Sequence, residues 1–180
     1  MNFLEDPDAR LMAEVAAGNL DAFENLVIRQ QKSAWSLAYR FLGNAPDAED
    51  VVQEAFLRIL RAAPRYRPAA QFRTYLFSIV GNLCKDRLPK KRAVFLEEAA
   101  LLRDPKPDAG ETLESRERSA AVRSALDSLP ARQRVAVLLR HYEGLSYDEI
   151  AGTLRTSAKA VDSLLHRARR TLQQRLSGLR

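Results

Sequence analysis

Apolar residues recur along most of this chain at intervals of three and four positions, the spacing that places them on one face of an α-helix. Phe23, Leu26, Val27, Ala34 and Leu37 are one example, in a stretch with no helix-breaking residue. No run of alternating β-branched residues bounded by hairpin turns is visible. The pattern therefore predicts an all-α fold.

The first half of the chain divides into four predicted helices. A short helix at residues 7–17 ends at Gly18, and a long one begins after Asn19 or Asp21 and ends at Gly43. The third opens with a proline in its first turn and runs to about residue 62. The fourth spans about 70–88, and we expect Pro89 to end it.

A change of composition separates the two halves. Residues 93–113 hold five acidic and two basic residues together with two prolines and a glycine, which predicts a flexible acidic linker. Helical periodicity then resumes, with breaks at 128–130, 143–145 and 155–157. We therefore expect two small helical domains, at residues 1–92 and 114–180, joined by the linker 93–113.

Composition narrows the class of protein. With 180 residues, 46% hydrophobic and 29% charged, the chain is long enough for one ordinary or two small packed domains. Cys84, His141 and His166 cannot assemble a zinc ligand set, so we expect no metal, and no cofactor is indicated. The single cysteine favours a reducing compartment. No stretch approaches the roughly 18 apolar residues of a membrane helix, and the acidic start is unlike a secretion signal, so the expected location is cytoplasmic.

Charge is strongly segregated along the chain. Residues 1–28 carry six acidic residues against one basic. Residues 65–92 carry eight basic against one acidic, and residues 155–180 carry seven against one. Each basic stretch on its own also fits a solvated helix face. Two separate basic stretches, one in each half, favour two contacts with nucleic acid.

The C-terminal half has the spacing of a helix-turn-helix. Ser146 and Glu149 form a predicted capping box at the start of a two-turn helix, and Arg155, Thr156 and Ser157 break it from a longer one. The longer helix places Val161 and Leu165 inward, and its polar and basic residues outward. An exposed, arginine-bearing second helix fits entry into a DNA major groove, whereas a plain helical hairpin is the alternative.

Two patterns stand out in the first half. The predicted third helix has a buried apolar stripe and an exposed acidic and polar one, which is either a solvated face or a docking surface for a basic partner. The fourth helix interleaves aromatic and basic residues, as proteins that bind unstacked single strands do. Asn82 is its best candidate for reading a base edge, and Cys84 is expected in the core.

Residues 21–67, 72–92 and 129–172 together resemble the extracytoplasmic-function (ECF) group of bacterial RNA polymerase sigma factors. The most specific segments are DAEDVVQE at 47–54 and LSYDEIA at 145–151. The resemblance implies a non-enzymatic initiation factor with no catalytic residue. Its first domain (region 2) would bind the clamp of core RNA polymerase and the melted −10 element of promoter DNA. Its second (region 4) would bind the −35 duplex and, through another surface, the polymerase flap.

The resemblance assigns these roles residue by residue. The polymerase-binding candidates are Asp47, Asp50, Gln53 and Glu54. The −10 candidates are Arg65, Tyr66, Arg67, Arg73, Asn82 and Lys85. The −35 candidates are Arg155, Lys159, Asp162, Ser163, His166, Arg167 and Arg170. The acidic linker would follow the RNA-exit path, and an anti-sigma factor is a further candidate partner.

One departure and two rivals qualify this interpretation. Relatives commonly carry a basic residue where this chain has Asp162, so its −35 preference is expected to differ. A stand-alone helix-turn-helix regulator would explain residues 114–180 but leaves the acidic helix unused. An enzyme that holds Mg²⁺ on Asp47, Glu49 and Asp50 lacks partner carboxylates or a histidine base.

Overall fold

The computed structural model describes residues 6–67, 70–98 and 113–177, and within these every regular element is helical, which confirms the all-α prediction. The elements are α1 (Pro7–Ala16), α2 (Leu20–Leu42), α3 (Ala45–Ala62), the 3-10 turn η2 (Ala63–Arg65), α4 (Phe72–Glu98), α5 (Leu113–Asp127), α6 (Ala131–His141), α7 (Tyr147–Leu154) and α8 (Ala158–Leu176).

The helices of the first half begin and end at residues with clear physical roles. The side chain of Asn19 caps α2 by accepting from the amide of Ala22 at 3.2 Å, and Asn44 caps α3 by accepting from the amide of Asp47 at 2.8 Å. Gly43 ends α2 with a φ of 79°, a left-handed conformation that glycine adopts without strain. These caps agree with the predicted boundaries.

The proline at position 89 does not end α4 as the sequence predicts. The helix continues to Glu98, so residues 93–98 of the predicted linker are helical. An internal proline removes one backbone hydrogen bond and strains one turn, and the helix here persists on both sides of it. The central part of the predicted linker, residues 99–112, lies outside the described residues.

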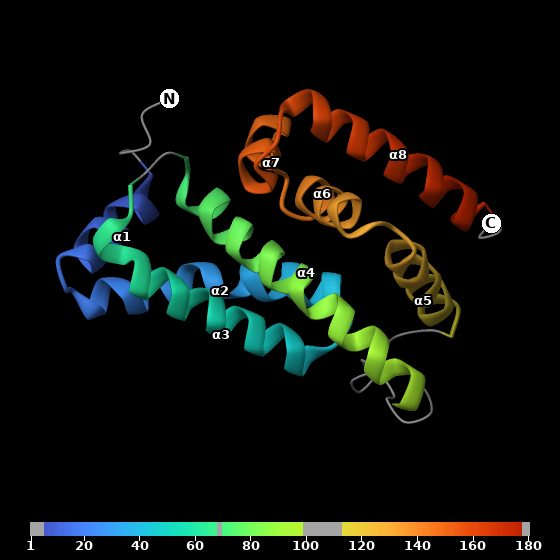
Figure 1. Ribbon diagram of the computed structural model, residues 1–180, viewed down its shortest axis with the longest axis horizontal. Helices are drawn as coiled ribbons and strands as arrows, with labels where there is room; N and C mark the ends of the chain where they lie inside the picture. Colours follow the sequence, from blue (N-terminus) through green and yellow to red (C-terminus); the bar gives the residue numbers. More distant parts are fainter. Residues whose placement is uncertain (1–5, 68–69, 99–112, 178–180) are drawn as a thin grey trace.

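The two predicted domains pack against each other. α4 runs between α1–α3 on one side and α6–α8 on the other (Figure 1). Contacts join α2 to α6 and α4 to α7, and one continuous apolar core includes Phe41, Phe77, Leu138 and Ile150. Cys84 is fully buried within it, as expected. The sequence alone predicts both domains but not this shared interface.

The described residues contain neither a helix that could span a membrane nor a cluster of side chains that could hold a metal ion. No helix there combines the length and the apolar character needed to cross a bilayer. No group of three or more His, Cys, Asp or Glu side chains in that part of the chain is arranged to hold a metal ion.

Candidate protein and nucleic-acid interfaces

The acidic stripe of the sequence forms one face of α3. Val51, Val52, Ala55, Phe56 and Ile59 are buried on the opposite face. That burial fixes the rotation of the helix about its axis, so the polar residues point outward. Of the predicted polymerase-binding residues, Asp50 and Gln53 are exposed and Asp47 and Glu54 are half-buried, and all four lie on this one face.

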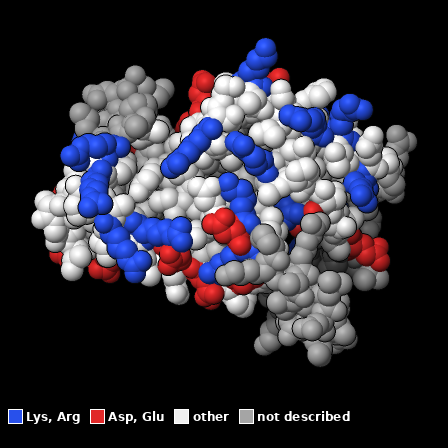
Figure 2. All heavy atoms as spheres, viewed as in Figure 1, with Lys and Arg blue, Asp and Glu red and all other residues white. Residues whose placement is uncertain are grey.

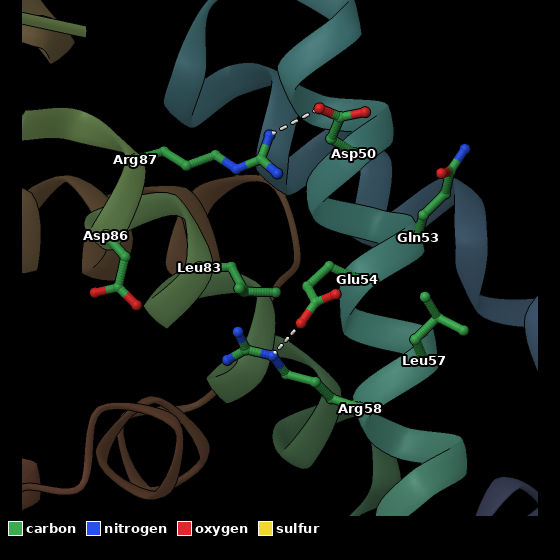
Figure 3. A pocket seen from close by; sticks show the side chains of 8 residues that line it. All are labelled: Asp50, Gln53, Glu54, Leu57, Arg58, Leu83, Asp86 and Arg87. Carbon is green, nitrogen blue, oxygen red and sulfur yellow. Dashed lines mark hydrogen bonds and ion pairs between the residues drawn. The ribbon is translucent and has the colours of Figure 1, made fainter. Parts of the chain in front are cut away.

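Two arginines neutralise part of this face. Arg87 on α4 places its guanidinium 3.3 Å from the Asp50 carboxylate and donates to the backbone carbonyl of Asp47 at 3.2 Å. Arg58 donates to Glu54 at 2.7 Å, and this hydrogen bond holds the pKa of the Glu54 carboxyl below its usual value. Both pairs are drawn in Figure 3.

A shallow hollow of about 380 Å³ lies between the two ion pairs. It is lined by Asp50, Gln53, Glu54, Leu57, Arg58, Leu83, Asp86 and Arg87. Leu83 forms part of its floor between the charged pairs (Figure 3), and Leu57 at its edge is 46% exposed. An apolar floor with a charged rim suits a side chain from a partner helix. Sequence reasoning missed Leu83 and Arg87, because only the packing of α3 on α4 brings them here.

The predicted −10 residues before α4 divide into exposed and packed side chains. Arg65 and Arg67 are exposed, whereas Tyr66 packs against Phe72 and Tyr75 with ring centroids 6.4 and 5.3 Å away. The Tyr66 hydroxyl is buried and has no hydrogen-bond partner. Burial, followed by the nearby Asp6 and Tyr75, raises the pKa of Tyr66 to about 12. Tyr66 therefore has a structural role: its ring packs the segment before α4 against the first turn of that helix.

A carboxylate missed by sequence reasoning positions the start of α4. Asp6 accepts from the amide of Asp8 at 3.0 Å in α1 and from the amide of Phe72 at 2.7 Å in α4. One side chain thus satisfies free amides at the beginnings of two helices. Its sequence signal is only an aspartate before a proline, which predicts the cap of α1 but not the contact with α4.

The predicted −10 residues on α4 occupy two faces. At 100° per residue, Asn82 and Lys85 lie within one face, and Arg73 lies on the opposite one. Asn82 is exposed and Lys85 is half-buried. Arg73 instead points toward the second domain, where it forms an ion pair with Glu143. The structure therefore brings Asn82 and Lys85 together but places Arg73 apart from them.

The helix-turn-helix begins with the predicted capping box. The Ser146 hydroxyl accepts from the Glu149 amide at 3.3 Å, and the Glu149 carboxylate accepts from the Ser146 hydroxyl and amide, each at 2.7 Å. These bonds hold the pKa of Glu149 below its usual value. Arg155 ends α7 in a left-handed conformation with φ of 49°, and Ser157 then caps α8 by accepting from the amide of Ala160. The tight turn between the helices is set by these local bonds.

The outer face of α8 carries six of the seven predicted −35 residues, and Arg155 lies in the turn before it. Val161, Leu165 and Ala168 are buried against the domain. All seven −35 candidates are exposed: Arg155, Lys159, Asp162, Ser163, His166, Arg167 and Arg170. In Figure 2, lysine and arginine side chains are spread over the visible face, including the upper part where Figure 1 places α8. The arrangement presents one basic helix face to solvent.

A second hollow of about 610 Å³ lies between α6, α7 and the end of α8. Its lining includes Val137, Leu165, Leu172 and Leu176, with Arg140, His141 and Arg169 among its polar residues. It combines apolar walls with a basic rim and is built partly from the buried side of α8. It is therefore distinct from the outward −35 face.

Comparison with known families gives two matches. The model described as Sigma-70 region 2 matches residues 26–94, and the model described as Sigma-70, region 4 matches residues 119–172. Together they cover more than half of the chain. The first includes the acidic face of α3, and the second includes the helix-turn-helix.

Individual proteins show the same likeness. The chain is 34% identical to the ECF RNA polymerase sigma factor SigE of Mycolicibacterium smegmatis over 88% of its length, but it spans only 63% of that relative. It is 32% identical to the RNA polymerase sigma-H factor of Pseudomonas aeruginosa, over 97% of this chain and 96% of the relative. Among solved structures, CnrH in complex with the cytosolic domain of CnrY is 30% identical, with a TM-score of 0.75 over 95% of this chain and 97% of that one.

Proposed function

The chain belongs to the ECF group of RNA polymerase sigma factors, and we propose from this that it binds core RNA polymerase and directs initiation at promoters with its own −35 and −10 elements. We propose it as a non-enzymatic, cytoplasmic factor. The observation that carries the proposal is the presence in one chain of an exposed acidic face on α3 and an exposed basic face on α8.

The polymerase contact is assigned to the face of α3. Asp50 and Gln53 are exposed there beside the Leu83 hollow, which offers a partner helix both charge and an apolar seat. We propose the hollow between α6, α7 and α8 as the binding site for the polymerase flap. Its apolar walls and basic rim fit an apolar segment flanked by acidic residues.

The promoter contacts are assigned to two other surfaces. The outward residues of α8 would enter the major groove of the −35 element, with Arg167 and Arg170 suited to guanine or phosphate and Ser163 and His166 to base edges. Asn82 and Lys85, on one face of α4, would contact the melted −10 strand together with the exposed Arg65 and Arg67.

A protein antagonist is also proposed. The solved relative CnrH is in complex with the cytosolic domain of CnrY. A partner of this kind would compete with polymerase if it covers the acidic face of α3.

The decisive experiment is transcription in vitro with bacterial core polymerase on a library of genomic fragments, with the 5′ ends of the transcripts sequenced. Defined start sites with shared elements near −35 and −10 are expected. Absence of stimulated starts, together with tight duplex binding without polymerase, would favour a stand-alone regulator instead.

A pair of variants tests the polymerase contact. Asp50→Lys with Glu54→Lys should weaken binding to core polymerase at least tenfold and leave duplex binding by α8 unchanged. Asp21→Lys with Glu24→Lys makes the same charge change at exposed positions of α2 and should leave polymerase binding intact. An equal loss of polymerase affinity in both double variants would show that the change in net charge, and not the face of α3, weakens binding.

A further inference from the structure

The carboxylate of Asp6 lies between the N-termini of two helices. One oxygen accepts from the amide of Asp8 in the first turn of α1 at 3.0 Å, and the other accepts from the amide of Phe72, the first residue of α4, at 2.7 Å. Amides at the start of a helix have no acceptor within the helix, and the helix dipole places positive charge there. One negative side chain therefore stabilises both helix ends, although Asp6 and Phe72 are 66 positions apart.

A second aspartate fixes α1, and with it Asp6, on the first domain. The Asp8 side chain is buried, and its carboxylate accepts from the Nε of Arg29 at 2.6 Å and from the side-chain amide of Gln30. Both partners lie on α2. Met12 of α1 is fully buried in the core. The position of Asp6 is therefore set by the packing of α1 on α2.

The segment that precedes α4 is held from the same side. α1 packs against η2 as well as against α4. Tyr66, directly after η2, donates its amide to the carbonyl of Ala63 at 3.0 Å, and its ring packs on Phe72 and Tyr75. The hydrogen bond from the Phe72 amide to Asp6 thus fixes the backbone of a residue on which the Tyr66 ring rests.

This segment carries two of the proposed −10 residues. Arg65 and Arg67 are exposed on either side of Tyr66 in the chain. Arg67 donates to the backbone carbonyl of Tyr66 at 2.9 Å. Their positions therefore depend on how Tyr66 is seated against the first turn of α4.

The other two proposed −10 residues lie further along α4. At 1.5 Å per residue, Asn82 and Lys85 are about 15 and 20 Å along the helix axis from Phe72. A strand that contacts both sets requires a fixed separation between them, because a binding site loses selectivity when its groups are displaced by as little as about 0.5 Å. That separation depends on where the first turn of α4 is held.

We propose that Asp6 is a positioning residue for the −10 contact, because its bond to the Phe72 amide holds the start of α4 in register with Arg65 and Arg67. The proposal rests on the proposed function. Asp6 is an anion and would repel a phosphate, so it acts through the residues that it holds. Its contribution is to the selectivity with which the unpaired −10 strand is bound.

Asp6→Ala removes both acceptors and tests this role. The protein is bound to core polymerase and mixed with a duplex whose −10 strand is unpaired, using the −10 sequence found in the transcription experiment. The readout is the affinity for this DNA divided by the affinity for the same DNA with a scrambled −10 strand. The ratio should fall about fivefold, the factor that one ordinary hydrogen bond contributes. Loss of folded protein would lower both affinities together and leave the ratio unchanged.

Asn19→Ala is the matched control. Asn19 caps α2 by accepting from the Ala22 amide at 3.2 Å, a local bond that involves neither α4 nor a proposed −10 residue. Its loss should lower the urea midpoint and leave the ratio at the wild-type value. An equal fall of the ratio in Asn19→Ala and Asp6→Ala would overturn the positioning role, because any loss of stability would then produce it.

Asp6→Asn covers the case in which Asp6→Ala does not fold. Asparagine caps helices as well as aspartate does, so α1 should still form. Its single oxygen can accept only one of the two bonds. With that oxygen on the nearby Asp8 amide, the nitrogen of the side chain faces the Phe72 N–H, a donor against a donor. The ratio should therefore fall in this variant too.

Amide hydrogen exchange, measured by NMR, reports the bond directly. The Phe72 amide opens α4 and has no acceptor within the helix, so it should exchange faster in Asp6→Ala and Asp6→Asn. The amide of Val80, inside α4, is the internal reference and should not change. A Phe72 amide that stays slow in Asp6→Ala would overturn the claim that Asp6 holds the start of α4. A variant with a fast Phe72 amide and a wild-type ratio would overturn the positioning role.

The outcomes separate this proposal from the function on which it rests. If the wild-type complex does not prefer the matched −10 strand, the proposed −10 recognition is wrong, and the role of Asp6 with it. If the wild-type complex has the preference and Asp6→Ala keeps it, only the positioning role is wrong.

Discussion

The guanidinium of Arg87 on α4 lies 3.3 Å from the carboxylate of Asp50 on α3, so a cation of the protein itself covers part of the proposed polymerase-binding face. The Asp50 side chain is still 65% exposed. A basic residue of a partner would therefore compete with Arg87 for a carboxylate that is already paired.

Removing the Arg87 guanidinium should strengthen the binding of core polymerase to the face of α3. Exposed ion pairs contribute roughly 0–1 kcal/mol, so Arg87→Gln is expected to raise the affinity for core polymerase about two- to fivefold. Fluorescence anisotropy of labelled protein, titrated with core enzyme, measures this. Lys32→Gln, an exposed position on α2, is the control. Weaker binding by Arg87→Gln would mean that Arg87 itself contacts the polymerase.

Asp162 should reduce the affinity of α8 for DNA. It is exposed among basic residues on the face proposed to enter the major groove. Asp162→Arg should tighten binding to any duplex and steepen the dependence of log affinity on log salt by about one to two, because each new phosphate contact releases counterions. Glu117→Arg makes the same charge change on α5, away from this face. An unchanged salt slope in Asp162→Arg would contradict the placement of Asp162 near phosphates.

The capping box predicts a loss of stability in acid. Hydrogen bonds from the hydroxyl and the amide of Ser146 lower the pKa of Glu149, so the unfolded chain takes up this proton first as the pH falls. The contribution is fully present above the ordinary pKa of glutamate, about 4.3, and is lost as the pH falls through the lower folded value. Glu149→Gln should therefore lower the urea midpoint at pH 7 and flatten its fall below pH about 4.5.

The control for this measurement is Glu117→Gln, at an exposed position on α5. It should follow the wild-type curve. A Glu149→Gln curve parallel to wild type at every pH would show that the capping carboxylate does not contribute in this way.

Tyr66 predicts a loss of stability in alkali. Its folded pKa is about 12, above the ordinary value of 10, so the unfolded chain loses this proton first and stability declines as the pH rises from 10 to 12. Tyr66→Phe should remove this part of the decline. Because the hydroxyl is buried without a partner, the variant should be as stable at pH 7 as wild type, or more stable by up to about 1 kcal/mol.

Tyr66→Ala completes this test. Loss of the ring from its contacts with Phe72 and Tyr75 should cost roughly 2 kcal/mol or more. If Tyr66→Phe proved as costly as Tyr66→Ala, the hydroxyl would have a partner in solution, and its role in the fold would need revision.

The sequence by itself determined the helices and which faces of them are buried. Caps such as Asn19, Asn44 and Ser146 act on amides three residues away, and apolar periodicity acts over one or two turns, so both can be recognised along the chain. Pro89 is the exception, because its local tendency to break a helix was overcome in α4. The outward positions of Asp50 on α3 and Arg167 on α8 followed from the same periodicity.

Only the tertiary structure decided which charged residues meet. Arg87 with Asp50, Arg73 with Glu143, and Arg134 with the carbonyl of Phe41 are separated by 37, 70 and 93 positions. No periodic or capping pattern in the sequence identifies the partner of an arginine, since its charge can pair with any acceptor that tertiary packing brings within reach. The docking of the second domain on α4 therefore cannot be predicted from the sequence pattern. It depends on the complementarity of two surfaces that exist only after each domain has folded.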